Sequence, residues 1–200
     1  QALYSNTANL NVAVGYQAAY ANSSGTNITA VGDRALVSNT TGSSNSAFGN
    51  QALNTNTTGA SNTAFGSTAL YSNTTASNNT AVGYQGLYNS TGNNNTSLGY
   101  GAGYSVTTGG GLVFIGRLAG ANSAGITGDY SVGIGSASLY SLTSGAYNTA
   151  IGTDSLRSNT TASNNTAVGY QAGYSNTTAT NNTIVGHQAL YANTTGADIC

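Results

Sequence analysis

The 200-residue sequence has no Pro, Met, Trp, Lys or Glu, and only one Cys. Charged residues make up 4% of the chain, against about 25% in a typical globular protein. With three Arg and a net charge of −1, it has no basic surface to neutralise phosphates, so we expect no nucleic-acid partner. The single cysteine, Cys200, excludes an internal disulfide. The lack of Met predicts an internal segment or a processed product.

Long apolar runs and clusters of titratable residues are missing too. No stretch approaches the ~20 apolar residues that span a bilayer, and none resembles a signal peptide, so we expect no membrane insertion in this segment. Catalysis needs titratable groups brought together, but Asp33, Asp154 and His187 stand far apart in the chain. No Cys/His set has metal-ligand spacing. We therefore expect no enzyme activity, no cofactor and no metal.

A recurring glycine organises what is present, mainly Gly, Asn, Thr, Ser, Ala and Tyr. Its spacing is 17 residues almost everywhere, with 16 before Gly99 and 19 before Gly135. A period of this length is typical of stacked repeats. Glycine suits a position that needs a positive φ or close backbone approach. We predict a structural turn at each of them: Gly15, Gly32, Gly49, Gly66, Gly83, Gly99, Gly116, Gly135, Gly152, Gly169 and Gly186.

Apolar residues mark two further positions of each repeat. The residue before the glycine is always apolar and mostly β-branched or aromatic, which indicates a strand. We predict that these residues form the core: Val14, Val31, Phe48, Phe65, Val82, Leu98, Ile115, Ile134, Ile151, Val168 and Val185. Leu stands four residues after the glycine in most repeats, as at Leu53 and Leu70, and usually follows Ala.

The consensus repeat predicts two short strands, Thr-Ala-Val and Gln-Ala-Leu-Tyr, joined by the glycine and followed by a polar return. About eleven such rungs at about 4.8 Å give a rod of roughly 50 Å, along which Tyr71, Tyr88 and Tyr104 form a ladder. We expect an all-β repetitive β-solenoid or parallel β-roll, as a single array over residues 1–200. Rungs within 1–98 and 149–200 are regular, whereas those within 99–148 are degenerate.

The pattern leaves the oligomeric state open. Neighbours in a strand face opposite sides, so each strand has one bulky and one tiny face. The tiny face suits close approach of a second backbone layer, either the opposite wall of a monomeric solenoid or a neighbouring chain. A few apolar side chains per rung do not offset the entropy of ordering 17 residues. Shared burial would help, and we favour a homotrimer over the monomer.

The repeats resemble those of a known group of fibres. The sequences Asn-Thr-Ala-Val-Gly-Tyr-Gln-Ala at 79–86 (with Gly at 86) and 165–172, and Asn-Ser-Ala-Phe-Gly-Asn-Gln-Ala at 45–52, resemble YadA-type trimeric autotransporter heads and, more closely, phage tail-fibre repeats. The resemblance implies a left-handed parallel β-roll trimer that displays an adhesive surface on a virion or bacterial cell. The period of 17 departs from the usual, shorter autotransporter-head repeat.

We therefore expect a structural and adhesive segment of an extracellular or virion fibre, with a host-surface glycan or protein as receptor. Tyr16, Tyr84, Tyr100 and Tyr170 are candidate surface contacts, able to stack on sugars or to stiffen the rod. The two-residue insertion within 124–130 is either local drift or a loop that contacts a ligand. The alternative function is a monomeric Thr/Asn-rich solenoid that binds ice or a crystalline polymer. Against it, the Thr rows of the return break at Val106 and Leu142.

Overall fold

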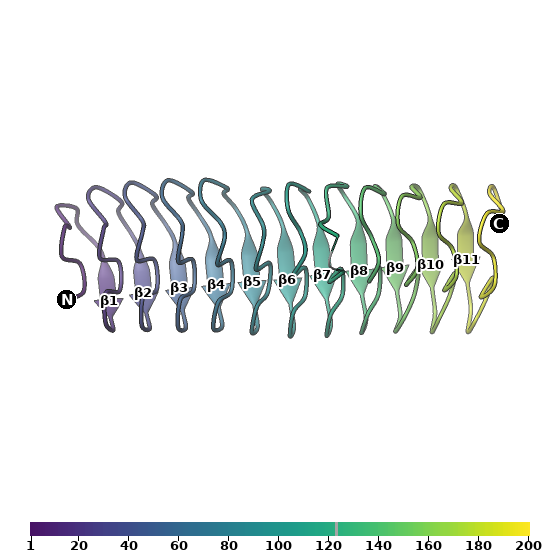
Figure 1. Cartoon of the computed structure of the whole chain (residues 1–200), viewed down its shortest axis with the longest axis horizontal. Coiled ribbons are helices and arrows are strands. Elements are labelled where there is room, and N and C mark those ends of the chain that lie inside the picture. The colour runs from purple at the N-terminus through teal and green to yellow at the C-terminus, as the bar shows by residue number, and fades with distance from the viewer. Residues whose placement is uncertain (123) are drawn as a thin grey trace.

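The computed structural model describes residues 1–122 and 124–200 as an elongated stack of rungs (Figure 1). It contains eleven three-residue strands: β1 Val12–Val14, β2 Thr29–Val31, β3 Ser46–Phe48, β4 Thr63–Phe65, β5 Thr80–Val82, β6 Thr96–Leu98, β7 Val113–Ile115, β8 Val132–Ile134, β9 Thr149–Ile151, β10 Thr166–Val168 and β11 Thr183–Val185. The described residues form no helix, hence none that could cross a membrane. The predicted all-β solenoid with rungs of about 17 residues is confirmed.

The strands form one parallel sheet in sequence order, which continues unbroken through the degenerate rungs. Thr63 pairs with Thr80, Ala64 with Ala81, and Phe65 with Val82. Because this in-register pairing repeats, equivalent residues of successive rungs form columns along the axis, as threonine and alanine do here. The ladder expected at Tyr71, Tyr88 and Tyr104 is observed, with ring centroids 5.1 and 5.2 Å apart.

The second predicted strand is wrong. In Gln-Ala-Leu-Tyr the first and third residues have left-handed backbones, as at Gln51 (φ 56°) and Leu53 (φ 51°), so the segment curves as a series of turns. Its N–H groups alternate in direction. Ala52 donates within the rung to Gly49, whereas Leu53 donates to Ala69 of the next rung. The segment thus forms a second wall that is hydrogen-bonded along the axis without being extended.

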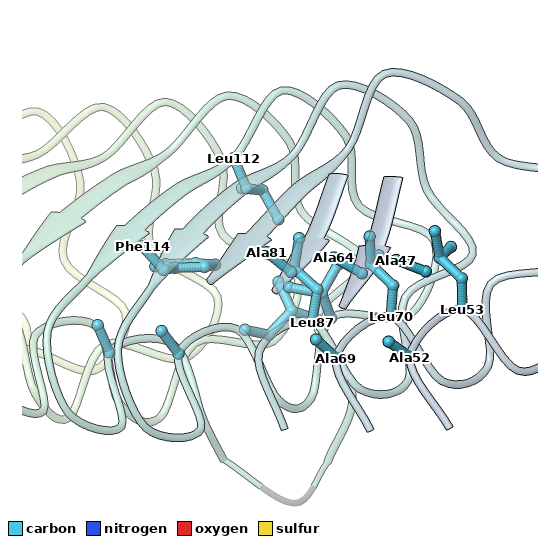
Figure 2. Close-up of a cluster of buried hydrophobic side chains, with 14 of the residues drawn as sticks. Ala47, Ala52, Leu53, Ala64, Ala69, Leu70, Ala81, Leu87, Leu112 and Phe114 are labelled. Atoms are coloured by element: carbon cyan, nitrogen blue, oxygen red, sulfur yellow. The ribbon is translucent and has the colours of Figure 1, made fainter. Parts of the chain in front are cut away.

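The predicted core is also wrong, because the strands face the opposite way. None of Val14, Val31, Phe48, Phe65, Val82, Leu98, Ile115, Ile134, Ile151, Val168 and Val185 is buried in the chain, and the exposed fraction reaches 57% at Phe65 and 69% at Val185. The interior instead holds the strand-centre alanines, such as Ala64, and the leucines of the second wall, such as Leu70, which are fully buried except at the ends of the stack (Figure 2). The two walls lie in contact: a Cβ added to Gly86 of the second wall would lie 3.5 Å from Cβ of Ala81, an ordinary van der Waals distance.

Asparagines fill the polar part of the interior. Asn39 donates its side-chain amide to Asn22 Oδ1, Asn56 to Asn39 and Asn73 to Asn56, each at 2.8 Å. All four are fully buried. These four amide nitrogens also donate to backbone carbonyls within their own rungs, which offsets much of the cost of burying the column, although Asn73 Oδ1 has no partner among the described residues.

A different packing solution occurs around β7. Phe114 occupies the inward position that is alanine in most rungs, and it is fully buried. The positions around it are occupied by glycine: Gly103 and Gly120 stand where most rungs have leucine, and Gly133 stands where most have alanine. A Cβ added to Gly120 would lie 2.5 Å from Cζ of Phe114. One aromatic ring therefore fills the volume of several smaller side chains, which keeps the interior close-packed through the degenerate rungs.

Candidate binding surfaces

The outer face of the sheet carries a continuous apolar row. This outward apolar row consists of the eleven residues that precede the turn glycines, from Val14 to Val185, and five of them are more than 36% exposed. Phe48 and Phe65 contact one another within it, with ring centroids 5.4 Å apart. The row contains no charged residue. Contiguous apolar surface of this kind marks an interaction site more often than a solvated face.

A row of hydroxyls lies beside it on the same face. The first residue of each strand also points outward and is Thr or Ser in eight strands: Thr29, Ser46, Thr63, Thr80, Thr96, Thr149, Thr166 and Thr183. Valine occupies this position in β1, β7 and β8. The sequence prediction placed the threonine rows only in the polar return, and it missed this second set on the sheet.

The four tyrosines predicted as surface contacts, Tyr16, Tyr84, Tyr100 and Tyr170, are between 45% and 60% exposed. Each directly follows a turn glycine. The structure brings together only Tyr84 and Tyr100, which stack with centroids 5.5 Å apart. Tyr170 stacks on His187 at 5.2 Å, and the Arg34 guanidinium lies 5.9 Å from the Tyr16 ring centroid. These tyrosines thus lie on separate rungs and form no single site.

The second wall carries another aromatic column, in which Tyr88 lies between Tyr71 and Tyr104. Burial raises the pKa of Tyr88 above its ordinary value of 10.0, and repulsion from Tyr71, Tyr104 and Tyr84 raises it further. The folded chain therefore holds this proton more tightly than the unfolded chain does. The stability linked to Tyr88 is complete below pH 10 and is lost as the pH rises through the raised pKa.

This shift predicts a weakening of the fold in alkali. We expect the thermal midpoint to fall above about pH 10, because the unfolded chain loses the Tyr88 proton first. Replacing Tyr88 by Phe removes the ionisable group and keeps the ring. In circular dichroism melts, the thermal midpoint of the variant should fall less steeply with rising pH than that of the wild type. If the thermal midpoint falls equally steeply with pH in both proteins, the assignment to Tyr88 is contradicted.

The acidic residues support the rungs individually. Asp33 accepts a hydrogen bond from Asn50 Nδ2, Asp129 from the Gly110 N–H and Asp198 from Asn181 Nδ2, at 2.7–3.1 Å. Asp154 forms an ion pair with Arg157 at 2.6 Å. In the part of the chain that the structure describes, no three His, Cys, Asp or Glu side chains cluster as metal ligands would.

A pocket of about 280 Å³ lies where the chain departs from its regular rung. Asn89, Tyr104, Ser105, Thr107, Ala124 and Gly125 line it. The chain is back in register at Ile126, which bridges to Val106, so the extra residues lie just before Ile126. Two features of the sequence mark this place, the interval of 19 residues and the loss of tyrosine at Ala121, but neither identifies Asn89 or Ser105.

Comparison with known proteins returned no match to any family model, any curated protein or any solved structure. The resemblance to tail-fibre and autotransporter-head repeats remains a prediction.

Proposed function

We propose that this chain is a segment of a homotrimeric fibre, which projects from a virion or a bacterial surface and presents a binding surface. The observation that carries the proposal is the outward apolar row. It runs along all eleven strands, whereas the interior of the chain is already filled by alanine and leucine. The residues of the row therefore lie outside the filled interior of one chain, and burying them against other chains would stabilise the rod.

Further copies of this chain are the partners that fit the row. A symmetry axis parallel to the stack keeps the rungs of all copies level, so each residue of the row would meet its own equivalents at every rung. The row is one residue wide per rung, which suits a narrow core around such an axis. The number three and a left-handed coil come from the resemblance to trimeric fibre repeats.

The receptor in this proposal is a host-surface glycan or protein, contacted by the faces that remain outside the trimer. The exposed tyrosines Tyr16, Tyr84, Tyr100 and Tyr170 support an adhesive role, because aromatic rings are enriched at binding surfaces. The low content of charged side chains, 4% of the sequence, favours neutral over ionic ligands.

Replacing Phe65 by Asp tests the trimer. Phe65 lies in the middle of the exposed row, and three carboxylates around one axis would be buried without partners. We expect sedimentation velocity to show loss of the trimer. Tyr130, which is 60% exposed outside the row, provides the matched control Tyr130→Asp, and this variant should keep the trimer. A wild-type monomer, or a trimer unaffected by Phe65→Asp, would contradict the proposal.

Ice or crystal binding is a second candidate because of the outward hydroxyl row. A flat sheet with regularly spaced threonines can match a repeating surface, and eight of the eleven strands supply Thr or Ser. The bulky side chains of the adjacent row, Phe48 and Phe65, disturb that flatness. Thermal hysteresis measured on the monomeric fraction would support this candidate, and its absence in wild type and Phe65→Asp would exclude it.

A further inference from the structure

We propose that the pocket at the irregular rung binds one neutral pyranose ring, with Tyr104 as the stacking platform. This inference rests on the proposed adhesive function and specifies one site for it. The pocket measures about 280 Å³, near the lower end of the about 300–1,000 Å³ usual for small-molecule sites. A single sugar residue suits this size, as does the terminal residue of a longer glycan.

Tyr104 has one ring face available because its column ends there. Its other face stacks on Tyr88 with an interplanar angle of 13°. The equivalent residue of the next rung is Ala121, which has no ring to continue the stack. Ala124 and Gly125, which follow Ala121 in the chain, line the pocket together with Tyr104. The apolar C–H face of a pyranose is complementary to the electron-rich face of an aromatic ring.

The backbone ladder also opens at this rung. In regular rungs the residue after the aromatic position donates its N–H to the next rung, as Ser72 does to Tyr88 O at 2.9 Å. Ser105 occupies the same position. In the described part of the chain, its N–H donates no corresponding bond to the Ala121 carbonyl oxygen. The Ser105 hydroxyl is likewise without a partner among these residues, although Ser105 is only 3% exposed. A buried hydroxyl is normally paired, and Ser105 lines the pocket, so a small shift of its side chain would let the hydroxyl bond to a ligand.

The remaining lining groups suit sugar hydroxyls. The Asn89 side chain is half-buried and can donate from its amide nitrogen and accept at its oxygen. Thr107 donates its hydroxyl hydrogen to Ile126 O at 3.0 Å, which leaves its oxygen free to accept. The lining contains no charged side chain, so the pocket favours a neutral hexose or N-acetylhexosamine over an acidic sugar. Asn122 Nδ2 donates to Leu142 O at 3.1 Å, which ties this part of the rung to the next one.

Saturation-transfer NMR on the full chain tests the site with glucose, galactose, mannose, N-acetylglucosamine and N-acetylneuraminic acid as probes. We expect transfer to at least one neutral sugar and none to the acidic one. Tyr104→Ala should weaken binding at least about tenfold, because the platform is lost. Ala121→Tyr should abolish it by continuing the stack over Tyr104, without removing a polar group. Tyr174→Ala, at the same position of a regular rung, is the control and should bind as wild type does.

Circular dichroism melts establish that each variant is folded before binding is compared. No transfer to any neutral sugar would overturn the inference, and so would binding that survives both Tyr104→Ala and Ala121→Tyr. Neither result bears on the trimer, which sedimentation tests separately, so failure of the sugar site and failure of the fibre proposal are distinguishable.

Discussion

Replacing Phe114 by Ala is expected to destabilise the chain by about 3–5 kcal/mol, as loss of a fully buried phenylalanine usually does. The cavity would be unusually hard to fill, because glycines surround the ring. Gly120→Leu alone should also be severe, since its Cβ would lie 2.5 Å from the ring. Combined with Phe114→Ala, however, it rebuilds the common rung and should recover part of the loss. Urea unfolding measures each step.

The double variant is the informative one. Leu in the left-handed conformation is tolerated at the equivalent positions, such as Leu139 (φ 49°), so backbone strain does not prevent the rescue. Ile184 and Gly173 form an independent pair of the same design, with a Cβ on Gly173 only 2.8 Å from Ile184 Cδ1. At each pair, the double variant should lose less stability than the sum of the losses of its two single variants. A double-variant loss equal to that sum at both pairs would contradict the size compensation.

Replacing Gly66 by Ala is expected to break the stack locally. Gly66 has φ +145°, and an added Cβ would lie 2.4 Å from the carbonyl oxygen of Gly83 in the next rung. Backbone strain costs about 1–3 kcal/mol, and separating the rungs adds to it, so a total above about 4 kcal/mol is expected. Hydrogen exchange should show lost protection around β4 and β5, with distant rungs protected, because each rung contacts only its neighbours.

Gly186 provides the matched control. It has a similar φ of +130°, but the nearest atom to an added Cβ is Ala189 Cβ at 3.7 Å. Gly186→Ala therefore retains the backbone strain and lacks the clash, and should cost about 1–3 kcal/mol. Equal costs at Gly66 and Gly186 would show that rung contact is not what requires glycine.

Much of the fold could be predicted from the period of the glycines. The nearly constant interval predicted stacked rungs in register, and the apolar residue before each glycine located the end of every strand. The wrong core has a physical reason. Hydrophobicity alone places Val and Phe inside, whereas the thin interior takes Ala from the strand and Leu from the opposite wall in most rungs, and a larger residue such as Phe114 only where glycine stands opposite. The alternation Thr-Ala-Val defined two faces but not which one was inside.

The second wall and the pocket could not be predicted from the sequence, for other reasons. Gln-Ala-Leu-Tyr alternates like a strand, yet the left-handed backbone at Gln51 and Leu53 arises from residues without an intrinsic preference for it. The pocket depends on a bond that Ser105 does not make, and a pattern of residue types does not reveal a missing partner. The interruption of the tyrosine column at Ala121 was the available signal.

The molar mass of the unmodified chain in solution, measured by light scattering, tests the central claim most directly. If the outward apolar row joins three copies, the mass is three times the chain mass of 19.8 kDa at all concentrations above the dissociation range. A stable particle with the mass of one chain, its valines and phenylalanines in water, would contradict it.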